Sequence, residues 1–253
     1  MNLKLKGVSA IAAVALLSAG TASAQLNDGL DGSNATSVFI SVVERDDTNA
    51  ATRNLVLDTG LNAFQLWDES AVGWSTTSEQ ASAVQGFLNS ATGTVSFNLG
   101  AGLTLTNTED YGIATTGTSG GPEGGSAAAL AALNTGRTNI IAFIGNANAG
   151  TFVDGVLEVP GAADPGFHGL GEWGNNFGGA IQPSNEILFG DVAPIQGWRL
   201  NFAEEGIVNE QLALITSDLA SGNIAIEVIP VPAAVWLFGS ALGLLGWVRR
   251  RAA

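Results

Sequence analysis

Apolar residues that alternate with other residues, between frequent glycine-rich turns, constrain this chain more than any other feature. In the segment SVFISVVERDD, Val38, Ile40 and Val42 occupy every second position before a charged turn, which is typical of a half-buried β-strand. Glycine supplies 34 of 253 residues, about twice the usual 7%, so turns are frequent. We expect an all-β fold of about nine or ten strands with two short helices, as an antiparallel β-sandwich or jelly roll, because the βα alternation of a parallel sheet is missing.

Two segments carry helical spacing. Residues 78–90 place apolar side chains on one face, with Ser78 as the N-cap, and residues 126–136 form a short alanine-rich helix that ends at Gly136. The apolar runs at 137–148 and 150–159 predict central strands. Residues 53–67 predict a strand, a break at Gly60 and a further segment.

The first 24 residues have the three parts of a secretion signal. Lys4 and Lys6 form a basic start, and residues 8–17 form an apolar core that is too short to span a membrane. A cleavage box of small residues follows. It consists of Ala22, Ser23 and Ala24, with Gln25 as the expected first residue of the mature chain.

The last residues form a second apolar segment of a different kind. Residues 233–248 carry no charge, and as a helix they reach about 24 Å, close to the thickness of a thin membrane. Trp236 and Trp247 lie near its ends, where aromatic rings favour the membrane interface. A cluster of arginines then keeps the end of the chain cytoplasmic and leaves the body on the far side: Arg249, Arg250 and Arg251. A plain C-terminal anchor is the alternative interpretation.

This tail, IPVPAAVWLFGSALGLLGWVRRR, resembles a PEP-CTERM sorting tail, in which a proline motif precedes an apolar helix and a basic cluster. The resemblance covers about the last 25 residues. Pro230, Val231 and Pro232 stand where the family has Pro-Glu-Pro. The resemblance implies a Gram-negative exporter, an exosortase-type enzyme that removes the tail, and delivery of the chain to the cell surface or to extracellular polysaccharide. The logic is that of other sorting signals whose apolar tail is removed after it has served as an address.

The chain therefore divides into a signal peptide at 1–24, a β-rich extracytoplasmic domain at 25–229 and a sorting tail at 230–253. Of nine Lys and Arg residues, two lie in the signal and three in the tail, which leaves four against 23 acidic residues and a net charge of −19 for the domain. Such a charge excludes nucleic acid and anionic lipid as partners. We expect an acidic polysaccharide to bind only through bridging divalent cations, held weakly at many carboxylates, and we expect no cofactor.

The absence of cysteine means that this exported domain relies on its core for stability. The sharpest hint of an enzyme is GTSGG at 117–121, a G-x-S-x-G match centred on Ser119, with Asp164 and His168 following in hydrolase order. The match arises easily in a chain rich in Gly and Ser, and the βαβ framework is missing. We therefore expect a non-enzymatic protein. A small serine hydrolase remains an alternative, and we expect His168, the only histidine, to pack beside Phe167.

A carbohydrate-binding module is the second alternative. Trp173, Asn175 and Asn176 lie in a Gly- and Asn-rich loop at 167–177, where an exposed ring could stack on a sugar and amides could hydrogen-bond its hydroxyls. The other tryptophans of the domain are expected in the core. No metal centre is expected, because Asp28, Asp31 and Asn34 lack the register of a calcium loop.

Overall fold

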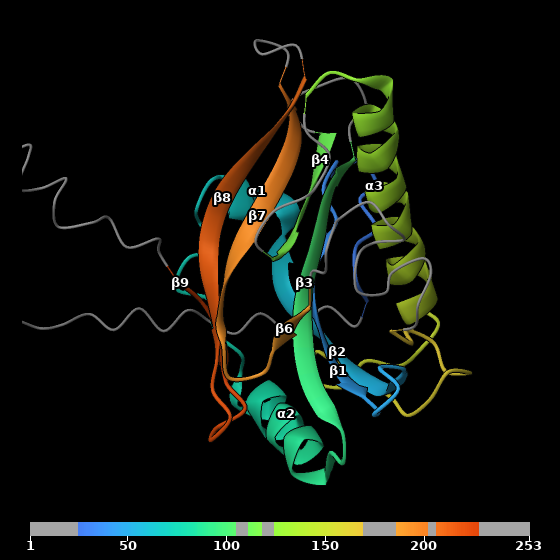
Figure 1. Ribbon diagram of the computed structural model, residues 1–253, viewed down its shortest axis with the longest axis vertical. Helices are drawn as coiled ribbons and strands as arrows, with labels where there is room; N and C mark the ends of the chain where they lie inside the picture. Colours follow the sequence, from blue (N-terminus) through green and yellow to red (C-terminus); the bar gives the residue numbers. More distant parts are fainter. Residues whose placement is uncertain (1–24, 105–110, 118–123, 169–185, 202–205, 228–253) are drawn as a thin grey trace, which may run out of the picture.

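A computed structural model describes residues 25–104, 111–117, 124–168, 186–201 and 206–227 of the chain. Within these residues nine strands form one antiparallel sheet in the order β5-β2-β1-β3-β4-β7-β8-β9, with β6 beside β3 (Figure 1). The strands are β1 Ser37–Arg45, β2 Ala51–Asn62, β3 Thr94–Thr104, β4 Tyr111–Thr116, β5 Val156–Val159, β6 Ile187–Leu188, β7 Val192–Asn201, β8 Gly206–Ser217 and β9 Ile224–Glu227. The helices are α1 Ala63–Trp67, α2 Ser78–Ser90 and α3 Ala127–Ala147.

The prediction of a β-rich antiparallel fold is confirmed, whereas the prediction of a sandwich or jelly roll, with two stacked sheets, is wrong. The single sheet curls, so that the apolar residues of β1, β2 and β3 share one core with those of β7, β8 and β9. The chain before α2 closes this core, since Gly73 N donates to Ile226 O at 2.9 Å and Thr76 N to Ile224 O at 2.9 Å. One curled sheet thus buries its inner face without a second sheet.

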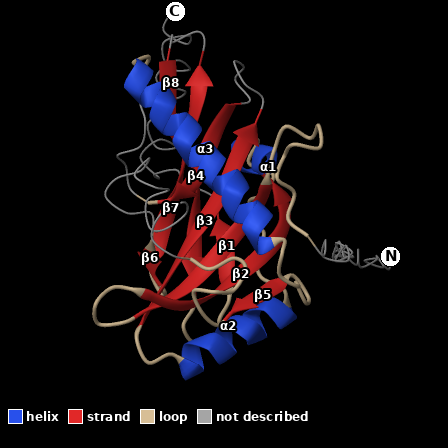
Figure 2. Cartoon of the chain, turned by 90° about the vertical axis from the view of Figure 1, so that its right-hand side faces the viewer, coloured by secondary structure: helices blue, strands red, loops and turns tan. Residues whose placement is uncertain are grey.

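Each face of the sheet has its own helices. The inner face carries Val38, Ile40 and Val42 and packs against α1 and α2. The outer face carries Phe39, Ile113 and Trp198 and lies under α3, which crosses it diagonally (Figure 2). The tryptophans described by the structure serve these cores: Trp198 is fully buried, and Trp67 and Trp74 pack at the edge of the inner core.

Helix α3 corrects the largest error of the sequence analysis. The expected helix at 126–136 and the expected strand at 137–148 are one helix of 21 residues, which Ser126 caps by accepting a hydrogen bond from Ala129 N at 3.1 Å. Ile140, Phe143, Ile144 and Ala147 repeat at helical spacing and are buried against the sheet. The described residues thus contain three helices rather than two.

The other local predictions have mixed outcomes. The helix at 78–90 is confirmed, but its N-cap is Thr77, which forms a capping box with Gln80. Strand β2 continues through Gly60, which adopts a φ of +69°, and ends at α1. The segment at 150–159 supplies β5, which is an end strand of the sheet and not a central one.

The predicted signal peptide and the predicted tail helix lie outside the described residues. Among the helices that the structure describes, none has both the length and the apolar character needed to cross a membrane.

Candidate functional site

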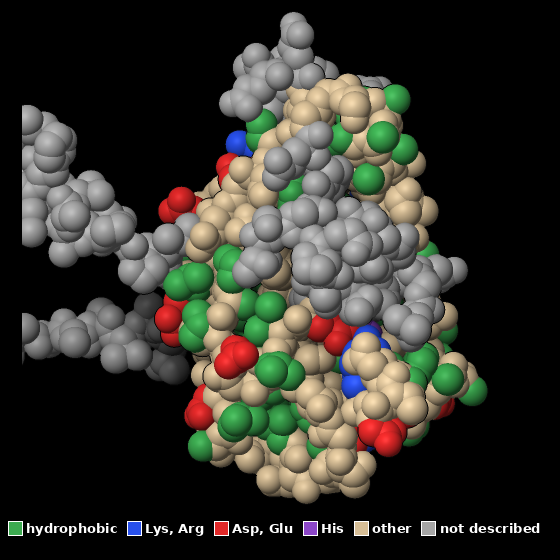
Figure 3. Space-filling model, in the orientation of Figure 1, with side chains coloured by type: hydrophobic (Ala, Val, Ile, Leu, Met, Phe, Trp, Pro, Cys, Tyr) green, Lys and Arg blue, Asp and Glu red, His purple; other side chains and the backbone are tan. Residues whose placement is uncertain are grey.

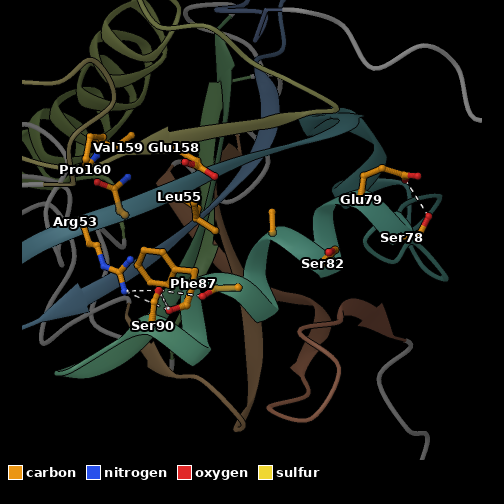
Figure 4. Close-up of a pocket in the computed structure, with 13 residues that line it drawn as sticks. Arg53, Leu55, Ser78, Glu79, Ser82, Phe87, Ser90, Glu158, Val159 and Pro160 are labelled. Carbon is orange, nitrogen blue, oxygen red and sulfur yellow. Dashed lines mark hydrogen bonds between the residues drawn. The ribbon is translucent and has the colours of Figure 1, made fainter.

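An open groove runs between α2 and the β2–β5 end of the sheet (Figure 4). Its volume is about 810 Å³. A second hollow of about 440 Å³ shares Glu79, Ala83 and Glu158 with it and extends toward Val153 and Asp154. The two together make an elongated surface site, which we call the α2–β5 groove.

The sequence of α2 keeps this groove open. Ser78, Ser82, Gly86 and Ser90 recur every fourth residue and line the groove, while Val84 and Phe87 turn into the inner core. A Cβ atom placed on Gly86 would meet nothing within 4 Å. The small side chains of this helix face therefore leave the groove unfilled.

Arg53 of β2 forms one end of the groove and is held rigidly. Its guanidinium lies over the ring of Phe87, 4.3 Å from the ring centre, and its Nη2 donates to Phe87 O at 3.3 Å and to Ser90 Oγ at 3.0 Å (Figure 4). Its Nε donates to the carboxylate of Glu44. The side chain is 28% exposed, so it presents a fixed cationic edge to the groove.

Glu44 behind Arg53 is an ionised, saturated carboxylate. It accepts hydrogen bonds from Thr92 N at 2.6 Å, Thr92 Oγ1 at 3.1 Å and Gly93 N at 2.8 Å, besides the one from Arg53. Burial raises its pKa, but these donors outweigh burial and hold the pKa at about 2. Arg53 is therefore neutralised by a partner that keeps its charge across the ordinary pH range.

A second ion cluster lies on the outer face of the sheet, around Arg45, which follows Glu44 on β1. Arg45 donates Nε and Nη2 to the two carboxylate oxygens of Glu186, which also accepts from Ser96 Oγ at 2.9 Å and meets His168 Nε2 at 2.8 Å. The side chains of Arg45, His168 and Glu186 are at most 8% exposed. These contacts outweigh the burial that raises the pKa of Glu186, and hold that pKa at about 2.

The sequence analysis expected His168 to pack beside Phe167; the structure buries it fully within this cluster, where its ring contacts Glu186. Burial lowers its pKa below the usual 6.5, so the ring is neutral at neutral pH and Nε2–H donates to Glu186. Asn54 couples the cluster to the groove, because its side chain accepts from His168 N at 2.9 Å and donates to Gly166 O at 3.0 Å. Asn54 also lines the groove.

The sequence-predicted site residues are only partly placed. Those outside the described residues are Ser119 of the hydrolase hypothesis, the glycan-contact candidates Trp173, Asn175 and Asn176, the cleavage-box residues Ala22 and Ala24, and the sorting residues Pro230, Val231, Pro232, Trp236, Arg249, Arg250 and Arg251. Of the remaining hydrolase candidates, the His168 ring contacts Glu186, whereas Asp164 lies in the turn that Gly161 begins. Gln25 begins the described body and is exposed.

The sequence analysis missed the groove. The sequence does indicate the two walls of the groove separately. Arg53 and Leu55 share a face of their strand by alternation, and Ser78, Ser82 and Gly86 share a face of their helix. Nothing local indicated that these two faces meet, because Arg53 and Ser90 are 37 residues apart.

On the face of the molecule shown in Figure 3, the visible acidic side chains lie apart from one another. Among the described residues, no group of three or more His, Asp or Glu side chains is arranged to hold a metal ion.

Comparison of the chain with protein-family models, with curated proteins and with solved structures finds no match.

Proposed function

We propose that the chain is an exported, non-enzymatic protein of the cell surface or extracellular matrix, sorted through its C-terminal tail. The observation that carries the proposal is the order of parts: a secretion signal at 1–24, an acidic body, then a proline motif, an apolar segment and three arginines. The tail resembles the PEP-CTERM family, which implies an exosortase-type enzyme as its processing partner. The chain is then exported through the inner membrane of a Gram-negative bacterium, anchored transiently, and released to the surface or matrix.

The described fold is compatible with the loss of both ends. Leu26 is buried, and two hydrogen bonds from the side chain of Asn148 anchor its backbone. This side chain accepts from Leu26 N at 2.9 Å and donates to Leu26 O at 2.8 Å. Cleavage after Ala24 leaves this anchor intact. The last strand, β9, ends at Glu227, so removal of residues beyond about 230 takes no described strand from the sheet.

The composition of the body supports an extracellular role. The domain has no cysteine and a net charge of −19. The ion pair Arg45–Glu186 connects segments 141 residues apart without a disulfide, and Arg53–Glu44 links the neighbouring strands β1 and β2. The dispersed carboxylates favour weak divalent-cation binding at many positions, through which an acidic polysaccharide could be bridged.

Intact-mass analysis of protein from the producing cells tests this proposal. We expect the exported species to start at Gln25 and to lack residues beyond about 230–233. Replacing Pro230 and Pro232 with alanine should leave a full-length, membrane-retained species, whereas Pro165→Ala, in an unrelated turn, should be processed normally. An uncut tail that stays stably in the membrane of cells making the unaltered protein would instead establish a permanent anchor.

Carbohydrate binding by the 167–177 loop is a second candidate. The observation that favours it is the sequence of the loop, in which Trp173 stands among glycines beside Asn175 and Asn176, whose amides suit sugar hydroxyls. A glycan array with and without calcium, comparing Trp173→Ala with Trp74→Ala, tests it. Binding that both variants retain equally would discard it.

The serine hydrolase is the least favoured alternative, since the side chain of its only histidine is 0% exposed. An acyl-ester assay with Ser119→Ala as the control tests it, and activity that this substitution abolishes would revive it.

A further inference from the structure

Among the described residues, one residue on the outer edge of strand β5 has no hydrogen-bond partner for its backbone groups. Asp58 N donates to Gly155 O at 2.8 Å, so this pair is a hydrogen-bonded one, and the paired register then alternates along β5. Val159 and Leu157 bond to β2, while Val156 and Glu158 turn their backbone groups away from it. The backbone N–H and C=O of Val156 form hydrogen bonds with the C=O and N–H of Val153, each at 2.9 Å. The N–H and C=O of Glu158 have no partner among the described residues.

This open edge borders the α2–β5 groove. Leu55, which is opposite Glu158 in the register, lines the groove from β2, and the small residues of α2 line it from the other side (Figure 4). A groove between an exposed strand edge and a helix is the geometry in which an extended peptide adds as a further strand. Backbone bonds to the edge give such a peptide affinity, and alternate side chains reach the groove.

The charge of the groove selects the peptide. Glu79, Asp154 and Glu158 lie around it and make no ion pair among the described residues, whereas the one cation, Arg53, is neutralised by Glu44. The groove is therefore net negative and complements Lys or Arg side chains. The domain at 25–229 contains no lysine. Three of its four arginines pair with Glu within the domain, and Arg137 lies over the ring of Tyr111, which argues for a partner other than a second copy.

The groove suits a peptide better than a sugar. Among the described residues that line it, Phe87 is the only aromatic one, and its ring is covered by the Arg53 guanidinium and is 6% exposed. Carbohydrate recognition commonly needs a bare aromatic face on which the sugar stacks, and the groove lacks one.

We propose that the α2–β5 groove binds an extended, basic peptide segment of a partner protein, which pairs with the backbone of Glu158 as an added strand. Pro160 follows directly and has no N–H to offer, so the edge accepts a short segment only. A short edge with a carboxylate beside it also resists pairing with copies of itself, because each copy carries the same negative charge.

The test uses the full-length chain and the blocked hexapeptide acetyl-Lys-Val-Lys-Val-Lys-Val-amide, with isothermal titration calorimetry at low and high salt. Its counterpart with Glu in place of Lys is the charge control. Two further versions carry N-methyl groups on the Lys amides or on the Val amides. An extended peptide presents these two sets of amides to opposite edges, so strand pairing requires only one set.

Two pairs of variants locate the site. Glu158→Gln and Glu158→Pro both remove the carboxylate, but only the proline removes the backbone N–H, at a position where an edge strand tolerates it. Gly86→Trp fills the groove from α2, and Gly86→Ala is its matched control.

We expect the Lys peptide to bind and the Glu peptide not to bind. Glu158→Pro should bind about fivefold more weakly than Glu158→Gln, the loss expected for one hydrogen bond. Gly86→Trp should lose binding at least tenfold relative to Gly86→Ala, and one N-methylated peptide should lose binding while the other keeps it.

Equal binding by both N-methylated peptides and the parent would overturn strand addition, even if Glu158→Pro fails to fold. Equal binding by the Gly86 pair would place the peptide elsewhere. A glucosamine hexamer that binds more tightly than the Lys peptide, and loses binding in Gly86→Trp, would show that the groove takes a cationic sugar and would overturn the proposal.

Discussion

The substitution Glu186→Gln tests whether the buried cluster on the outer face stabilises the fold. Glu186 accepts hydrogen bonds from Arg45, Ser96 and His168, and its side chain is 8% exposed. Glutamine keeps the shape of the side chain but removes the charge. Arg45 is then a buried cation without its anion, the situation in which loss of one partner is most costly.

The magnitude follows from the pKa of Glu186. The pKa falls from 4.5 to about 2 in the folded protein, and each pKa unit is worth 1.36 kcal/mol. The ionised carboxylate thus contributes about 3 kcal/mol to the free energy of unfolding at neutral pH. Loss of one partner of a buried pair costs about 3–5 kcal/mol, which agrees. For a domain of this size the melting temperature should drop by about 6–12 °C.

Urea unfolding followed by tryptophan fluorescence measures this loss at a series of pH values. Because the folded pKa lies below the unfolded one, the contribution of Glu186 is complete above pH 4.5 and disappears as the pH falls toward 2. The gap between the unaltered protein and Glu186→Gln should therefore narrow over that window. His168 makes a separate contribution: the free energy of unfolding falls as the pH drops below 6.5, because the lowered pKa of His168 means that the unfolded state binds the proton more tightly.

The matched control is Glu158→Gln, which removes an exposed carboxylate that makes no ion pair among the described residues. Its effect should stay within about 0.5 kcal/mol. A Glu186→Gln loss below about 1 kcal/mol at pH 7, or a gap that does not change between pH 4.5 and 2, would refute the reasoning.

Three further predictions concern other parts of the domain. Asp58 is buried and burial raises its pKa, so its charged form destabilises the fold at neutral pH, and the free energy of unfolding rises as Asp58 gains a proton at lower pH. Asp58→Asn should therefore not lower the melting temperature at pH 7, and should flatten this dependence of stability on pH. Trp198→Ala should cost about 3–5 kcal/mol in urea unfolding, because Trp198 is fully buried under α3. Attachment of residues 25–229 to an acidic polymer should require millimolar calcium; equal attachment in chelator would mean that the carboxylates only confer solubility.

The strands were predictable because their signal is local. Val38, Ile40 and Val42 face one core, as their spacing indicates. The prediction that this strand is half-buried is wrong, because α3 covers its other face and all nine residues of β1 are buried. The arrangement of the strands in one curled sheet was not predictable in this way. It depends on pairings such as β4 with β7, in which Gly112 lies opposite Arg199, and periodicity carries no information about such distant partners.

The error in α3 has a different cause. The run from Arg137 to Asn148 contains three isoleucines and one phenylalanine, and a short apolar run does not by itself distinguish a buried helix from a buried strand. The alanines before it favour a helix, and Gly136 is buried inside the helix rather than at its end. The spacing of apolar residues over the whole of 126–148, rather than over each half, indicates the single helix.

The candidate site is the least predictable part because it is made of contacts between distant residues. Glu44 and Arg45 are adjacent in sequence and point to opposite faces of β1, where they pair with Arg53 and Glu186. Glu186 is 141 residues from Arg45, so that pair could not be predicted from the sequence, whereas Arg53 is only nine residues after Glu44 and lies opposite it on the neighbouring strand. The consequence is functional as well as structural. Once Glu44 neutralises Arg53, the acidic side chains alone determine the charge of the groove, and a site that contains an arginine becomes one that favours a basic ligand.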